Sequence, residues 1–130
     1  MTCVDIRSFT RLTPPKHPYG KLAESVLPGF DISLVFAGET RARALNKSLR
    51  NKDYIPNVLS YLSGKKSGEI IICLTEARRQ APEYGLTYPQ FVAYLFIHGL
   101  LHLKGLPHGT RMERYEEKLM ASFLRVSLKH

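Results

Sequence analysis

The chain has 130 residues, of which 44% are hydrophobic and 23% charged. This composition fits one folded domain and excludes a wholly disordered chain. Its net charge of +8 favours partners that are polyanions. The longest apolar run, near residues 91–103, is too short to span a bilayer, and the first residues lack a signal-peptide pattern. With only two cysteines, we expect a cytoplasmic protein, one domain over residues 1–130, without membrane contact.

The first third of the chain predicts a strand, a short helix and a second strand. A strand is expected around residues 4–7, followed by a proline-rich loop. The segment "KLAESVL" predicts a short helix that ends at Pro28 and Gly29. The segment "DISLVFA" (31–37) alternates apolar and polar residues and contains β-branched side chains, which predicts a strand.

The middle of the chain predicts an amphipathic helix and a hairpin. From Glu39 or Thr40, apolar residues recur at helical spacing and leave a basic outer face. The segments "NVLSYL" and "GEIIICL" predict two strands, separated by the flexible, basic "SGKKSG". Because glycine stands at both ends of that loop, the two strands are expected to pair as a hairpin.

Two further helices follow, each with a candidate cap. The segment after Leu74 predicts a helix capped by Thr75. Thr87 is expected to cap the next helix, over about Pro89–Lys104, which is apolar around most of its circumference and therefore central. Gly105 fits the left-handed position that ends a helix.

A last helix is expected over about 110–128, with Met112, Tyr115, Leu119 and Phe123 on one side. Together these elements predict an α+β fold. We expect a single compact domain in which helices pack on a small mixed β-sheet and the central buried helix carries two histidines, His98 and His102.

Basic residues concentrate in the segment 41–66. Asp53 is the one acidic residue of this segment. Its seven basic residues are Arg41, Arg43, Lys47, Arg50, Lys52, Lys65 and Lys66. Such a segment attracts nucleic acid through counterion release. The alternative is a solvated face with no partner.

Three of the five histidines stand in "HGLLHLKGLPHG" (98–109). His98 and His102 are four residues apart, so their rings share one helix face. The turn after the helix can return His108 to that pair, making a tripod for a tetrahedral metal with an open fourth position, as in catalytic zinc sites. The alternative is a set of unrelated histidines. However, burying unpaired imidazoles among apolar neighbours costs free energy, so a bound metal is favoured. Gly99 stands where zincin proteases have glutamate, and it would let the helix approach another element closely.

These residues resemble a known family. "HGLLHLKGLPH" is similar to the H-G-x-L-H-L-x-G-x-D-H signature of the YbeY family, bacterial metal-dependent endoribonucleases of rRNA maturation. "LNKSLRNKDYIPNVLSY" (45–61) and "GEIIIC" (68–73) resemble two further segments of that family, in the same order. The resemblance implies one zinc ion per chain on His98, His102 and His108, and Arg50 in the cleft opposite the metal. It also implies an rRNA substrate and the small ribosomal subunit as a partner.

The chain departs from the family pattern in two places. Pro107 replaces the aspartate before the third histidine, and Ile55-Pro56-Asn57 replaces Pro-Thr-Asp. All three ligands remain, so we expect metal binding to persist while the catalytic surroundings differ.

Other polar residues have simpler interpretations. Cys73 is expected in the core, and His17 and His130 are expected to be incidental. Glu113, Glu116 and Glu117 are expected to form a solvated helix face. Ser60 has no neighbouring His or Asp in the sequence to make it a nucleophile.

The sequence therefore predicts a zinc-dependent endoribonuclease of rRNA maturation and ribosome quality control. One alternative is a ribosome-associated RNA-binding protein whose zinc is structural. Another is a metal hydrolase with a non-nucleic substrate, which the basic segment 41–66 makes less fitting.

Overall fold

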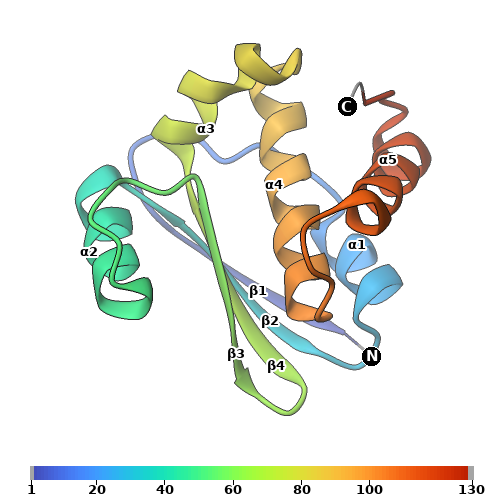
Figure 1. Ribbon diagram of the computed structural model, residues 1–130, viewed down its shortest axis with the longest axis horizontal. Coiled ribbons are helices and arrows are strands. Elements are labelled where there is room, and N and C mark those ends of the chain that lie inside the picture. Colours follow the sequence, from blue (N-terminus) through green and yellow to red (C-terminus); the bar gives the residue numbers. More distant parts are fainter. Residues whose placement is uncertain (1, 129–130) are drawn as a thin grey trace.

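The computed structural model describes residues 2–128 as one α+β domain with a four-stranded sheet (Figure 1). The elements in chain order are β1 (Cys3–Phe9), α1 (Tyr19–Val26), β2 (Asp31–Ala37), α2 (Glu39–Arg50), β3 (Val58–Gly64), β4 (Ser67–Cys73), α3 (Leu74–Gln80), the 3-10 helix η1 (Ala81–Tyr84), α4 (Tyr88–Leu103) and α5 (Thr110–Leu124).

The sheet is mixed, as predicted, with strand order β1-β2-β4-β3. β1, β2 and β4 run parallel, while β3 pairs antiparallel with β4 through the predicted hairpin. The two central strands, β2 and β4, are buried along most of their length, because helices cover parts of both sheet faces.

Helices lie on both faces of the sheet. α1 and α4 pack on one face, and α5 packs against α4 (Figure 1). On the other face, Leu45 of α2 contacts a small cluster formed by Val35, Ala37, Leu59 and Ile71. The main core therefore lies between the sheet and α4, and this helix is central, as its composition predicted.

Local signals explain the position of α4. Thr87 and Gln90 form the reciprocal capping box that fixes the start of the helix. The chain leaves the helix through Gly105, whose φ of 97° favours glycine. A Cβ placed on Gly99 would lie 3.1 Å from Ile70 Cγ2 of β4, so a small residue is needed for this close approach.

Several predicted boundaries were wrong. β1 is longer than the expected residues 4–7. α5 ends at Leu124 because Arg125 adopts a left-handed conformation with φ of 55°. α3 begins one residue before the expected cap, and the Thr75 hydroxyl contacts Cys73 Sγ at 3.4 Å instead of capping the helix. No helix within residues 2–128 is long and apolar enough to cross a membrane.

Candidate functional site

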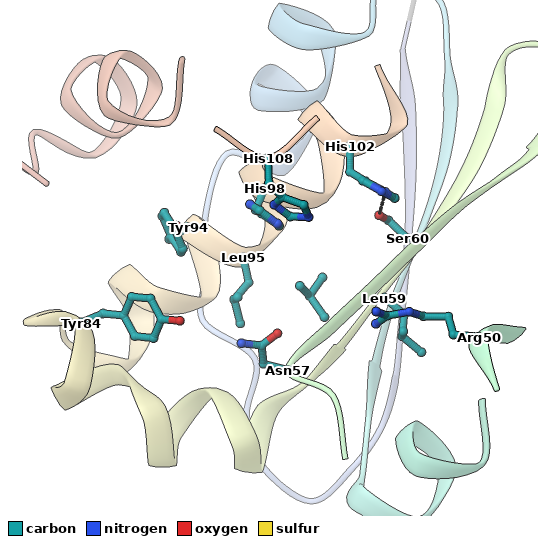
Figure 2. Close-up of a pocket in the computed structure, with 11 residues that line it drawn as sticks. Arg50, Asn57, Leu59, Ser60, Tyr84, Tyr94, Leu95, His98, His102 and His108 are labelled. Atoms are coloured by element: carbon teal, nitrogen blue, oxygen red, sulfur yellow. Dashed lines mark hydrogen bonds between the residues drawn. The ribbon is translucent and has the colours of Figure 1, made fainter. Parts of the chain in front are cut away.

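A pocket of about 310 Å³ lies between α4 and the start of β3 (Figure 2). Residues distant in sequence line it: Arg50, Asn57, Val58, Leu59, Ser60, Tyr84, Tyr94, Leu95, His98, His102 and His108. The pocket therefore contains every site residue that the sequence predicted, both the three histidines and the arginine.

The three histidine rings gather at one end of the pocket (Figure 2). The turn after α4 returns His108 to the helix, and its ring centroid lies 4.8 Å from that of His98 and 6.1 Å from that of His102. The helix is buried, but its histidine face is open: the side chain of His98 is 23% exposed, and His102 and His108 are more exposed. The three imidazoles are therefore not buried among apolar side chains, contrary to the expectation from sequence.

Glu116 orients the first histidine. His98 Nδ1 lies 2.7 Å from Glu116 Oε2, and the Tyr94 hydroxyl donates to the other carboxylate oxygen at 3.5 Å. Glu116 is only 2% exposed, so its predicted place on a solvated face was wrong. A signal was available in the sequence, because Glu116 lies on the helix side that buries Met112 and Leu119.

Ser60 of β3 contacts the second histidine. Its Oγ lies 3.0 Å from His102 Nδ1 (Figure 2). Burial lowers the pKa of His102, and His108, His98 and Arg50 nearby lower it further. The neutral imidazole is therefore favoured, the form that binds metals or accepts a proton.

The donor set fits zinc, whereas the ring orientations do not yet converge. If His98 donates Nδ1–H to Glu116, its Nε2 keeps a lone pair, as in histidines that ligate metals. Across residues 2–128, however, no three His, Cys, Asp or Glu side chains are arranged to hold a metal ion. His98 and His108 are stacked with planes only 27° apart, and in this arrangement their in-plane lone pairs do not meet at one point.

Arg50 reaches the pocket from the last turn of α2 (Figure 2). The helix ends at Arg50; the next residue, Asn51, is left-handed with φ of 56°, and the chain then turns toward β3. Buried Asn46 holds this turn, since its side-chain amide donates to the Tyr54 carbonyl at 3.0 Å. The exposed guanidinium thus faces the same cavity as the histidines.

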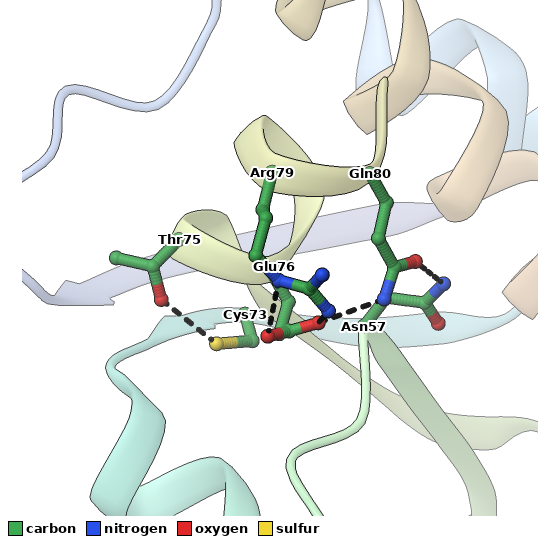
Figure 3. Close-up of polar contacts among 6 residues, drawn as sticks. All are labelled: Asn57, Cys73, Thr75, Glu76, Arg79 and Gln80. Atoms are coloured by element: carbon green, nitrogen blue, oxygen red, sulfur yellow. Dashed lines mark hydrogen bonds and ion pairs between the residues drawn. The ribbon is translucent and has the colours of Figure 1, made fainter. Parts of the chain in front are cut away.

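Asn57, one of the departures from the family pattern, is held by a polar network (Figure 3). Its Nδ2 donates to Gln80 Oε1 at 2.8 Å, and Gln80 Nε2 donates to Glu76 Oε2 at 2.7 Å. Glu76 also accepts two hydrogen bonds from Arg79, and these bonds lower the pKa of Glu76. An amide at position 57 is therefore accommodated and oriented within this chain.

The remaining predictions concern residues outside the pocket. Cys73 is buried, as expected. His17 has a structural contact, because its Nε2 lies 2.7 Å from the Pro89 carbonyl oxygen at the start of α4. His130 lies outside the described residues.

Comparisons with known proteins agree with the resemblance in sequence. The family model described as Endoribonuclease YbeY matches residues 16–129. A protein named Endoribonuclease YbeY from Azoarcus sp. is 34% identical, over 77% of this chain and 44% of the relative. A protein of the same name from Bdellovibrio bacteriovorus is 38% identical, over 62% of this chain and 55% of the relative. The one from Solibacter usitatus is 39% identical over 78% of this chain and 71% of the relative. The chain thus spans about half the length of the first two relatives.

A solved structure has the same fold. The solution structure of TM1509 from Thermotoga maritima superposes with a TM-score of 0.63 at 19% identity, covering 96% of this chain and 90% of that one. The matched family model, the identities and the pocket that unites the signature residues agree: this chain belongs to the YbeY family.

Proposed function

We propose that this protein is a zinc-dependent endoribonuclease that acts in rRNA maturation and ribosome quality control, on or near the small ribosomal subunit. One observation carries the proposal: a single pocket joins Arg50 to His98, His102 and His108. Relatives named as endoribonucleases support RNA as the substrate, and so does the net charge of +8. A cytoplasmic location follows from this role.

The three histidines would hold the metal. Their neutral nitrogens are the donors that zinc prefers, and the two α4 histidines already have contacts to Nδ1 that leave Nε2 for a ligand. Since the rings of His98 and His108 are stacked, binding requires them to reorient. When bound, zinc supplies Lewis acidity that polarises a phosphodiester oxygen and activates water.

Arg50 would bind the phosphate. A guanidinium offers two parallel N–H donors that match phosphate oxygens, and its charge stabilises the negative charge that builds up during cleavage. The cavity wall opposite Arg50 is α4, so a backbone phosphate in the pocket would lie between the guanidinium and the histidines (Figure 2).

Replacing Arg50 tests this function. Arg50→Ala should reduce single-turnover cleavage of a structured rRNA fragment about a hundredfold or more, the scale expected for one lost transition-state donor. Arg50→Lys should restore only part of the rate, because an ammonium lacks the planar pair of donors. Zinc content, measured on the same samples, should remain near one ion per chain, because Arg50 is exposed and supplies no metal ligand.

Arg41→Ala is the matched control. Arg41 lies on the same helix, but its guanidinium packs over the Phe9 ring at 4.2 Å, and Arg41 is not among the pocket residues. Equal cleavage by wild type and Arg50→Ala would remove the proposed role of Arg50. RNA binding with no cleavage by any variant would favour an RNA-binding protein with structural zinc.

A further inference from the structure

An aromatic series forms one wall of the pocket. The ring centroids of Tyr84 and Tyr94 are 6.0 Å apart, and Tyr94 lies 6.2 Å from His98. The ring of His98 in turn lies 4.8 Å from that of His108. The histidines end the series where the phosphate is expected. Tyr84 stands at the other end of the cavity (Figure 2), and the proposed function gives it no role.

Tyr84 is exposed although it is firmly placed. It is the last residue of η1, which ends at Gly85 with φ of 68°, and the amide of Gly85 bonds back to the Pro82 carbonyl at 3.0 Å. One ring face packs on fully buried Phe91 at a centroid distance of 4.6 Å, yet the residue remains 51% exposed. A rigid aromatic ring that is supported from below and half exposed can stack with a ligand at little cost in conformational entropy.

We propose that Tyr84 is a stacking platform for an unpaired RNA base next to the phosphate that Arg50 and the histidines hold. The inference rests on the proposed function and specifies its substrate: RNA that presents an unstacked base, from a single strand, loop or bulge. Such bases are commonly bound by stacking on aromatic side chains. Because any base has a π face, this platform contributes affinity more than sequence preference.

Asn57 supplies a polar group to the same cavity. One N–H of its amide is committed to Gln80, and the amide carbonyl oxygen can accept a hydrogen bond from the edge of a base. Leu95 lies in the cavity between Tyr84 and the histidines and provides an apolar surface (Figure 2). An aromatic platform, an apolar surface and an oriented amide together form a site suited to a nucleobase.

The test is RNA binding rather than cleavage. Tyr84→Leu keeps an apolar side chain over Phe91 but removes the flat ring, so its affinity for a short single-stranded RNA should fall about tenfold or more. Tyr84→Phe keeps the ring and should bind within about twofold of wild type. Affinities are measured by fluorescence anisotropy, with intact RNA verified on a gel and folding verified by thermal melting.

Two controls separate stacking from general effects. Phe9→Leu removes an aromatic ring that is 52% exposed on β1, the edge strand opposite β3, and should leave binding unchanged. A series of RNAs, each with one abasic nucleotide, locates the base. At one position, the missing base should weaken wild-type binding and abolish the difference between wild type and Tyr84→Leu.

The outcomes distinguish this inference from the proposed function. Arg50-dependent cleavage together with unchanged RNA affinity in Tyr84→Leu would overturn the platform and leave the nuclease intact. The platform would also be overturned if Tyr84→Leu lost the same affinity for every abasic RNA and for fully paired RNA. Tyr84 would then affect binding through its packing in the fold and not through a base. Absence of RNA binding by the wild-type protein would overturn both.

Discussion

At the scale of single residues, the pocket depends on contacts that position the histidines. Glu116 reaches His98 from α5, and Ser60 reaches His102 from β3, so two other elements set ring orientation on α4. Carboxylates in this position typically fix the tautomer of a metal-binding histidine and raise its basicity. Glu116 is therefore expected to contribute to zinc affinity without binding the metal.

Replacing Glu116 should weaken zinc binding. In Glu116→Ala, the affinity for zinc is expected to fall about 10- to 100-fold, whereas Glu116→Gln, which keeps an acceptor oxygen, should lose less. Affinity is measured by competition with a chromophoric chelator, and His102→Ala serves as the reference for a lost ligand. Thermal melting shows whether the buried position still folds. Wild-type affinity in both Glu116 variants would contradict this role.

The sequence predicted these residues unevenly, for a physical reason. Helical spacing places His98 and His102 on one face whatever the rest of the chain does, so this prediction needed only local geometry. The contact between Glu116 and His98 joins two helices, and its formation depends on how α5 packs against α4. Likewise, Pro82 and Gly85 mark a break in the chain, but the inclusion of Tyr84 in the pocket depends on how η1 packs beside α4.

At the scale of elements, predictions were right where a local signal was strong. Thr87 as a cap placed the start of α4, where the structure adds a reciprocal bond to Gln90, and glycine on both sides of a basic turn predicted the β3–β4 hairpin. They failed where the signal was generic. Thr75 resembled a cap, but α3 follows β4 directly: the extended residue before the helix is Cys73, and Thr75 already lies in the first turn.

The contact of α4 with β4 gives a prediction at this scale. A Cβ on Gly99 would press against Ile70, so Gly99→Val should destabilise the protein by about 1–3 kcal/mol through overpacking. Gly20→Val is the matched control, because a Cβ on that α1 glycine meets nothing within 4 Å. Ile70→Val should compensate part of the loss, which urea unfolding of the single and double variants would reveal. Strictly additive effects of the two changes would contradict a direct contact.

At the scale of the whole molecule, the basic segment 41–66 is not one continuous patch. Arg43, Lys47 and Lys52 lie on α2 or in the loop after it, beside Arg50, whereas Lys65 and Lys66 lie in the β3–β4 turn. Figure 1 shows α2 and that turn at different ends of the sheet. Arg43 is also paired with Asp53 at 2.8 Å, so it offers less to a ligand than its neighbours. Chain order had suggested a single footprint, but the fold divides it.

The division predicts that RNA length decides which charges matter. Lys47 is three residues before Arg50 on the same helix face, so Lys47→Ser with Lys52→Ser should weaken binding of both short and long single-stranded RNA. Lys65 is five residues beyond Ser60, about 17 Å along the extended strand, and only longer RNA should reach it. Lys65→Ser with Lys66→Ser should therefore weaken binding of long RNA alone.

Each lost phosphate contact should reduce the slope of log affinity against log salt by about 0.7. Binding across a salt series measures both quantities, and an equal effect of the two pairs on short RNA would show that the turn lies within the same footprint as α2.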